Sequence, residues 1–167
     1  AAVTRAARSD KATFEIPFGA IERPTTRRNT WEKARFEVPQ LRWADEGDGN
    51  HGLSLLNDSK YGADAVGNIL RLSLLRWETS PDPQADQGPQ HFAYALYPHA
   101  GNWQKAATIR HGYAFNVPLE SVAVSPHQGT LPPADSFVDI AADNLVLTTV
   151  KKAEDGKALI LRLYETT

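Results

Sequence analysis

Short segments in which apolar and polar residues alternate recur along most of the chain. Successive side chains of a strand point to opposite faces, so alternation with a period of two predicts a strand with one buried face. Segments with this pattern, or short apolar runs of strand length, are residues 13–18, 34–38, 52–56, 68–75, 90–97, 145–150 and 158–164. Turn-forming clusters separate them, among them EGDGN at 46–50 and EDG at 154–156. The pattern predicts an all-β, mainly antiparallel protein, a β-sandwich.

One stretch has helical spacing instead. Asn102 is a residue type that caps helices, and Trp103, Ala106, Arg110 and Tyr113 follow it at intervals that place them on one helical face. We therefore expect one short helix near residues 102–114. Proline clusters at 80–83 and 118–133 predict long loops, the second of them a linker before the last two strands.

Composition limits the class of protein. The 167 residues are 41% hydrophobic, which is enough for one domain, or for one domain and a fragment of a second. With 18 basic against 20 acidic residues the chain lacks the basic excess of a nucleic-acid-binding protein. It also lacks an apolar run near the ~20 residues of a membrane-spanning helix.

Two absent residue types change the picture further. Because there is no cysteine, a disulfide or a thiolate metal site is ruled out, which fits a cytoplasmic protein. There is no methionine either, residues 1–10 carry no apolar signal sequence, and residues 158–167 end in or just after an apolar run. We therefore expect the chain to be a piece of a longer protein.

The most suggestive polar segment is the turn at residues 57–62 (NDSKYG). Asn57, Asp58, Lys60 and Tyr61 place an amide, a carboxylate, an ammonium and a phenol between two predicted strands, and Asp64 follows closely. Groups of these types can hydrogen-bond the hydroxyl groups of a sugar, with the tyrosine ring as a flat contact surface. A turn that only satisfies its own backbone is an equally good interpretation.

Other candidates for chemistry are weaker. Asp82 and Asp86 form a carboxylate pair of the kind that glycoside hydrolysis uses, but both fit turn or loop-anchoring positions better. The five histidines show no close ligand pair such as HExxH, so each is interpreted as an ordinary loop or strand-end residue. We expect no catalytic residue and no metal site within these 167 residues.

Several motifs resemble those of a known family. The runs GLSLLNDSKYG at 52–62 and GNILRLSLLR at 67–76 look like the C-terminal β-domain of glycoside hydrolase family 38, the α-mannosidases. Further segments agree in the same order: FGAIERPT at 18–25, WEKARFEVP at 31–39, PDPQADQG at 81–88, YPHAGNW at 97–103 and NLVLTTVKKAEDG at 144–156. The resemblance covers residues 11–167.

The resemblance implies a domain plan and a division of labour. It predicts an N-terminal tail (1–10), a β-sandwich domain similar to the galactose mutarotase supersandwich (11–135), and the first strands of a smaller sandwich (136–167). Family members are retaining enzymes that cleave terminal α-mannosides with an aspartate nucleophile, a second carboxylic acid and zinc, all in an N-terminal α/β domain. This chain alone is then expected to be inactive and to hold no cofactor.

Two functions therefore remain as hypotheses. The first is a non-catalytic part of an α-mannosidase that packs on the catalytic α/β domain and shapes the cleft for α-mannoside glycans, with Asn57, Asp58, Lys60, Tyr61 and Asp64 as the candidate cleft residues. The second is an autonomous carbohydrate-binding module. Its stacking platform would be an exposed row of tryptophans: Trp31, Trp43, Trp77 and Trp103.

Overall fold

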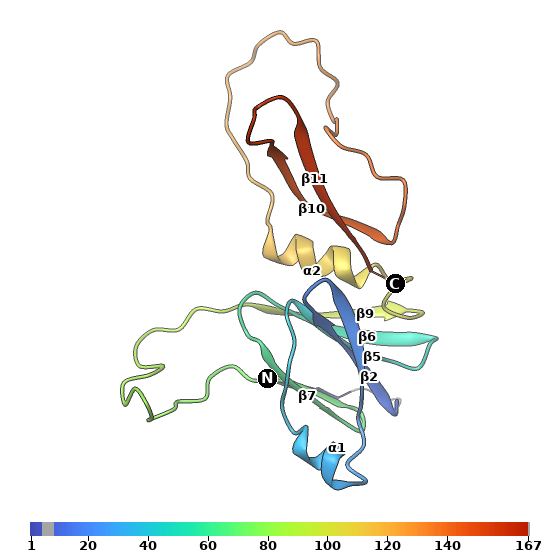
Figure 1. The fold of residues 1–167 in the computed structure, drawn as a ribbon, viewed down its shortest axis with the longest axis vertical. Coiled ribbons are helices and arrows are strands. Elements are labelled where there is room, and N and C mark those ends of the chain that lie inside the picture. The colour runs from blue at the N-terminus through green and yellow to red at the C-terminus, as the bar shows by residue number, and fades with distance from the viewer. Residues whose placement is uncertain (5–8, 167) are drawn as a thin grey trace. The chain divides into compact units, whose positions relative to one another are not determined.

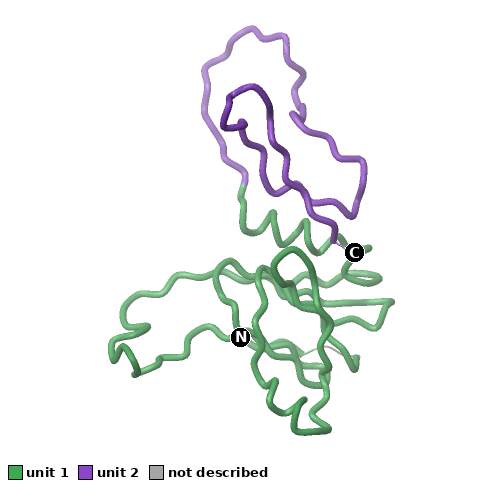
Figure 2. The backbone as a smooth tube through the Cα atoms, in the orientation of Figure 1, with its two compact units in different colours: residues 1–118 green, residues 119–167 purple. Residues whose placement is uncertain are grey.

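The computed structural model describes residues 1–4 and 9–166. They fall into two compact units, Ala1–Pro118 and Leu119–Thr167, which are coloured separately in Figure 2. The first unit closes at Pro118, earlier than residue 135, which the sequence analysis gave as the end of the first domain. Residues 119–143 contain neither helix nor strand, in keeping with their many prolines, and regular structure resumes at Leu145.

Antiparallel sheets make up most of the first unit (Figure 1). One sheet has the order β3-β2-β5-β6-β9, and its strands are β2 (Lys11–Ile16), β3 (Gly19–Pro24), β5 (Trp43–Gly47), β6 (His51–Asn57) and β9 (Tyr94–Ala100). The other has the order β1-β8-β7-β4, with β1 (Ala2–Thr4), β4 (Val38–Pro39), β7 (Gly62–Val66) and β8 (Ile69–Leu72). The prediction of a mainly antiparallel, all-β sandwich is confirmed.

The core of this unit lies between the two sheets. Alternate residues of β2, β5 and β6 point into it, and those of β7 and β8 meet them from the other side. The buried cluster consists of Ala12, Phe14, Ala44, Leu55, Ala63, Ala65, Leu70 and Leu72. The small side chains on β7 make room for Phe14, which is 1% exposed.

The second face of the five-stranded sheet is covered by helix α2 (Thr108–Asn116), which lies beside β5 and β6 in Figure 1. Trp43 is fully buried there and its ring lies 5.1 Å from that of Trp103. Gly112 allows the helix to approach, because a Cβ at this position would lie 3.0 Å from Trp43 Cδ1. The central strand β5 is thus buried on both faces and shows no alternation.

The structure corrects the expected helix near 102–114. Residues 103–107 form turns instead, and the Asn102 side chain accepts the backbone N–H of Lys105. Ala107 has a left-handed backbone (φ 53°), which separates these turns from the helix that begins at Thr108. Asn102 therefore caps a turn, and the helix begins later than the sequence predicts.

A second helix, α1 (Thr30–Ala34), was not predicted from the sequence. Asn29 accepts the backbone N–H of Glu32 at 2.9 Å, and the Glu32 carboxylate in turn accepts the Asn29 side-chain amide at 3.1 Å. These reciprocal bonds fix the first turn. The strand expected at 34–38 is consequently wrong over most of its length, and only Val38–Pro39 pairs, with β7.

The expected N-terminal tail also contains structure. Ala2–Thr4 form β1, which pairs with β8, and the amino group of Ala1 donates to the carbonyl of Leu72 at 2.7 Å. Val3 packs against the core and gives this short strand an apolar anchor. The remainder of the tail includes residues 5–8, which lie outside the described part.

The second unit contains one antiparallel hairpin, β10 (Leu145–Lys152) with β11 (Leu159–Glu165). An irregularity between Leu147 and Thr149 shifts its register. Several of its apolar side chains are exposed: Val150, Leu159, Ile160, Leu161 and Leu163. The two strands expected at 145–150 and 158–164 are confirmed with small shifts of their ends.

Truncating Phe14 tests the assignment of the core. Phe14→Ala should lower the free energy of unfolding by about 3–5 kcal/mol, because it removes a fully buried ring from a well-packed site. The same truncation at Phe36, which is 66% exposed, should cost less than about 1 kcal/mol. Urea unfolding of both variants measures the difference, and equal losses would contradict the packing described here.

Candidate functional site

The turn at 57–62 connects β6 of one sheet to β7 of the other, and Asn57 organises it. Its side-chain oxygen accepts the backbone N–H of Ser59 at 3.2 Å and of Lys60 at 2.7 Å, while its amide nitrogen donates to the carbonyl of Leu41 at 2.9 Å. Asn57 is 1% exposed. Its polar atoms thus hold the turn together from inside rather than facing a ligand.

Asp58 ties the turn to the segment that enters β9. Its carboxylate accepts the backbone N–H of Ala93 at 3.0 Å and the hydroxyl of Ser59 at 2.9 Å, and its own N–H donates to the carbonyl of Ala93 at 3.2 Å. The hydrogen bond from Ala93, followed by that from Ser59, lowers the pKa of Asp58 below its usual 3.8. These bonds also explain why β9 begins at Tyr94 rather than at residue 90.

Lys60 and Tyr61 form the outer part of the turn. The Lys60 ammonium lies 4.9 Å from the centre of the Phe92 ring, and the carbonyls of Lys60 and Tyr61 accept the side-chain and backbone N–H groups of Gln40. The Tyr61 side chain is 61% exposed. Of the predicted turn residues, Tyr61 presents the most side-chain surface to a ligand or another protein.

Asp64 lies apart from this turn surface. It belongs to β7, where its carboxylate forms ion pairs with Arg27, at 2.6 Å, and with Arg71 of β8. Its side chain is 13% exposed. Two cations hold it, so the structure gives Asp64 a role in joining β7, β8 and the segment before α1 rather than a place beside Tyr61.

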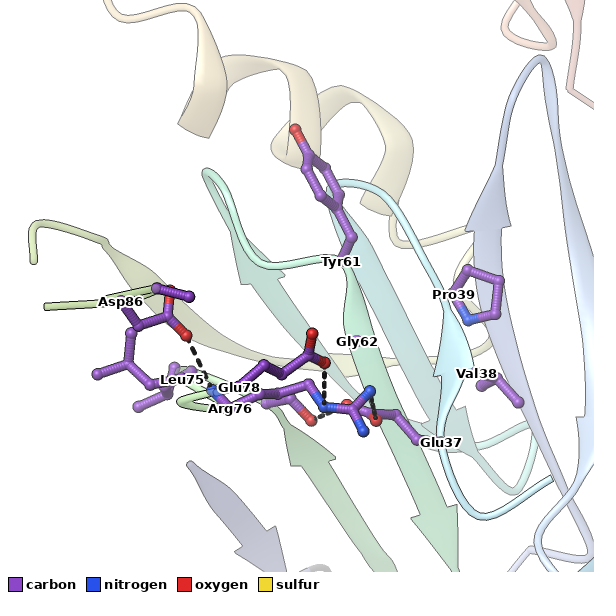
Figure 3. Close-up of a pocket in the computed structure, with 12 residues that line it drawn as sticks. Glu37, Val38, Pro39, Tyr61, Gly62, Leu75, Arg76, Glu78 and Asp86 are labelled. Carbon is purple, nitrogen blue, oxygen red and sulfur yellow. Dashed lines mark hydrogen bonds and ion pairs between the residues drawn. The ribbon is translucent and has the colours of Figure 1, made fainter. Parts of the chain in front are cut away.

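A pocket of about 530 Å³ opens beside the turn (Figure 3). Its lining comes from residues 37–39, 61–62, 73–76, 78 and 85–86. In Figure 3 Arg76 reaches between Glu37 and Glu78, with N–O distances of 3.1 and 3.6 Å, and the Tyr61 ring stands away from this group. The Ser73 hydroxyl donates to Glu37. Sequence reasoning placed Glu37 in a strand pattern and Arg76 just after one, and it missed the pocket.

The carboxylate pair Asp82 and Asp86 serves the loop that borders this pocket. Asp82 accepts the backbone N–H of Gln84 at 2.9 Å, and Asp86 accepts those of Arg76 at 3.4 Å and Trp77 at 3.0 Å. Both therefore act as turn and loop anchors, which is the interpretation that the sequence favoured.

Buried polar groups between the five-stranded sheet and α2 do not form a catalytic or metal site. His99 Nε2 lies 2.7 Å from Asp45 Oδ2, and the Ser54 hydroxyl donates to the same oxygen at 2.8 Å. Ser54 contacts the carboxylate and not the imidazole, so the geometry of a nucleophilic triad is missing. Across residues 1–4 and 9–166 no three histidine, aspartate or glutamate side chains gather where they would hold a metal ion.

The tryptophans do not form the row that a binding module would use. Trp43 is fully buried and Trp103 packs on it, whereas Trp31 and Trp77 are 78% and 65% exposed, one in α1 and the other in the loop after β8. The prediction that all four tryptophans form a stacking platform is therefore wrong. Within the described residues, no helix is both long enough and apolar enough to cross a membrane.

Comparison with known families agrees with the fold and the motifs. The sequence profile of the glycosyl hydrolases family 38 C-terminal domain matches residues 1–84, and that of the family 38 C-terminal beta sandwich domain matches residues 144–167. The first match spans half of the chain. The chain belongs to the C-terminal region of glycosyl hydrolase family 38.

Individual relatives carry α-mannosidase names. The chain is 47% identical over 162 residues to alpha-mannosidase 2C1 of Homo sapiens and 40% identical over 160 residues to alpha-mannosidase G of Dictyostelium discoideum. Each comparison covers 95% of this chain but only 15% of the relative. The fold matches an alpha-mannosidase from Enterococcus faecalis V583 with a TM-score of 0.83 at 20% identity, over 99% of this chain and 20% of that one.

The hydrogen bonds of Asp58 predict a pH dependence of stability. Because folding lowers its pKa, the charged carboxylate stabilises the fold above the unfolded pKa of about 3.9, and this stabilisation is lost as the pH falls through the folded pKa. Asp58→Asn should therefore destabilise the chain at pH 7, and the difference from wild type should shrink below about pH 4.

Urea unfolding at several pH values measures this difference. Ser59→Ala removes a weaker lowering hydrogen bond than the one from Ala93, so its pH-dependent loss should be smaller than that of Asp58→Asn. A loss in Asp58→Asn that is constant across the pH range would show that the Asp58 carboxylate gains nothing from Ala93.

Proposed function

We propose that this chain is the non-catalytic C-terminal β-domain region of a retaining, zinc-dependent α-mannosidase that hydrolyses terminal α-mannosides. In this proposal it packs on the catalytic α/β domain and shapes the glycan cleft. The family membership and the α-mannosidase names of relatives at 40–47% identity support the activity of the longer enzyme. The chain spans about a seventh of those relatives. In this proposal the catalytic machinery belongs to the part of the longer enzyme outside this chain.

The observation that carries the proposal is the apolar surface around the turn at 57–62. Tyr61 is 61% exposed, and Leu75 lines the same pocket at 49%. Tyr94 pairs in register with Asn57, and it and Leu96 are exposed to a similar degree. Large apolar side chains left exposed on the turn, in its pocket and on strand β9 are what a surface covered by another domain would present.

The turn residues have different roles in this proposal. Asn57 and Asp58 brace the turn through bonds to Leu41, Lys60 and Ala93, and Lys60 covers Phe92. Tyr61 projects from the braced turn and contacts the mannoside or a loop that does. A rigid support is what a positioning residue requires, because small displacements in a cleft weaken transition-state contacts.

Zinc chemistry is assigned to the rest of the longer enzyme. The nearest approach to a metal-ligand set is the pair His99 and Asp45, which is buried and also hydrogen-bonded to Ser54. Two ligands are fewer than the three protein ligands of a catalytic zinc site, so these residues do not fit that metal. No step of the reaction is placed on this chain.

The alternative, an autonomous carbohydrate-binding module, has less support. Its platform reduces to Trp31 and Trp77, because Trp43 and Trp103 pack against each other under α2. The cytoplasmic location inferred from the absence of cysteine stays a prediction.

The purified chain should show no α-mannosidase activity, with or without added zinc. The reason is that no group of side chains in the described residues is placed to hold a metal ion, and Ser54, His99 and Asp45 lack the geometry of a nucleophilic triad. Release of the aryl group from an aryl α-mannoside measures the activity. Turnover that disappears when a carboxylate of this chain is mutated would overturn the division of labour.

A longer α-mannosidase carrying this chain tests the role of the turn. Tyr61→Ala should lower kcat/KM for an α-mannoside by about tenfold or more, equivalent to roughly 1.4 kcal/mol of transition-state stabilisation. Asp58→Ala should have a similar effect through the position of the turn.

The matched control is Trp31→Ala, which removes an even more exposed aromatic ring (78% against 61%) from α1 and should leave kcat/KM unchanged. If Tyr61→Ala and Asp58→Ala keep wild-type kinetics but lower the melting temperature by several degrees, the turn is purely structural and the proposal fails.

A further inference from the structure

The pocket beside the turn has more hydrogen-bonding capacity than its own contacts use. Arg76 contacts Glu37 and Glu78 through Nη1 and Nε, and a guanidinium carries five N–H donors. Each carboxylate has about four acceptor positions, of which Glu37 uses one for Ser73 and one for Arg76. Donors and acceptors therefore lie side by side in a pocket of about 530 Å³, within the usual range for small-molecule sites.

Apolar walls border these polar groups. Val38, Pro39 and Leu75 line the pocket together with the exposed Tyr61 side chain. A ligand that matches this lining must present an apolar face on one side and both donating and accepting groups on the other. Hydroxyl groups on a carbon ring have this character, since each hydroxyl donates to a carboxylate or accepts from a guanidinium.

Hydrogen bonds to Asp86 hold one side of the pocket. Asp86 holds the backbone N–H groups of Arg76 and Trp77, and both Asp86 and Trp77 have left-handed backbones, with φ of 60° and 50°. A bulky residue rarely adopts this conformation, and such residues occur mainly where neighbouring structure enforces them, often at functional sites. Asp86 thus holds the loop that carries Arg76.

Gly62 makes space for the polar floor of the pocket. A Cβ at this position would lie 2.5 Å from Glu37 Oε1, closer than real Cβ contacts, and 3.2 Å from the Ser73 Cβ, which is tight. The backbone of Gly62 is not left-handed, so an added methyl group would act only by displacing the Glu37 side chain. Without a side chain at 62, Glu37 stays beside Ser73 and Arg76.

Charge narrows the choice of ligand. Three carboxylates, from Glu37, Glu78 and Asp86, and one guanidinium line the described pocket, so it repels anions such as phosphate or sulfate esters. We propose that this pocket is a subsite for a neutral hexose unit of the glycan, separate from the unit whose bond is cleaved. The inference rests on the proposed function for the identity of the sugar, but its test does not use catalysis.

The experiment is an NMR titration of the 167-residue chain with α-linked mannobiose, followed through backbone amide signals. Amide signals from residues 37–38, 61–62 and 73–78 should shift with one common dissociation constant. Arg76→Gln should weaken binding about tenfold or more, because it removes charged donors to the sugar hydroxyls. Gly62→Ala should weaken it comparably by displacing the Glu37 carboxylate.

Matched variants control for folding and charge. Arg28→Gln alters an arginine of similar exposure (67% against 61%) that also forms one 3.2 Å ion pair, with Asp10, and Gly19→Ala adds a methyl group with no atom within 4 Å. Both should bind like the wild type. Mannose 6-phosphate should bind more weakly than mannose because of the excess of carboxylates in the pocket.

Three results would overturn the subsite: no shifts at these residues, unchanged affinity in both Arg76→Gln and Gly62→Ala, or tighter binding of the phosphorylated sugar. Failure of the proposed function is separate, because it is measured as unchanged kcat/KM in Tyr61→Ala of the longer enzyme.

Discussion

The buried amide of Asn57 is the constraint on which the rest of this surface depends. It closes the turn between the two sheets through Ser59 and Lys60, and it fastens the turn to the carbonyl of Leu41. The backbone of Asn57 adds a bond to Arg42 and accepts one from Asn116 at the end of α2. Because this one residue joins β6, the approach to β5 and α2, the turn keeps a fixed position relative to both sheets.

From this fixed turn the neighbouring features follow. Asp58 determines where the long loop returns to the sheet at Ala93, and Gly62 leaves the space that Glu37 occupies. The loop between Arg76 and Asp86 then closes one side of the pocket. The polar residues of the turn at 57–62 thus mostly form internal hydrogen bonds. These bonds hold the exposed Tyr61 and the lining of the pocket in place.

Sequence reasoning predicted well where local pattern and burial agree. Strands with a clear apolar pattern, such as β6 and β8, were found within one to three residues, and the motifs at 52–62 and 67–76 led to the correct family. It failed where tertiary contacts override the pattern. Strand β5 carries Asp45 and Glu46, yet both are buried because the sheet core and α2 cover its two faces. The five-residue helix α1 depends on reciprocal bonds between Asn29 and Glu32, just before the segment predicted as a strand.

The candidate site could be predicted only in part from the sequence, again because tertiary contacts decide its geometry. The chemistry at 57–62 was visible as a cluster of polar types, but whether each group faces inward or outward depends on partners far away in sequence, such as Leu41 and Ala93. Glu37 and Arg76 are 39 residues apart and meet only because β4 and β8 both flank β7. No local sequence pattern predicts that Glu37 and Arg76 form a pair.

In our proposal the catalytic domain of the longer enzyme covers the surface around the turn. Hydroxyl-radical footprinting of the isolated chain and of a longer α-mannosidase containing it measures this directly. Oxidation of Tyr61, Leu75, Tyr94 and Leu96 should fall strongly in the longer enzyme, while that of Trp31 on α1 stays nearly unchanged. Equal oxidation of the four residues in both proteins would contradict the account.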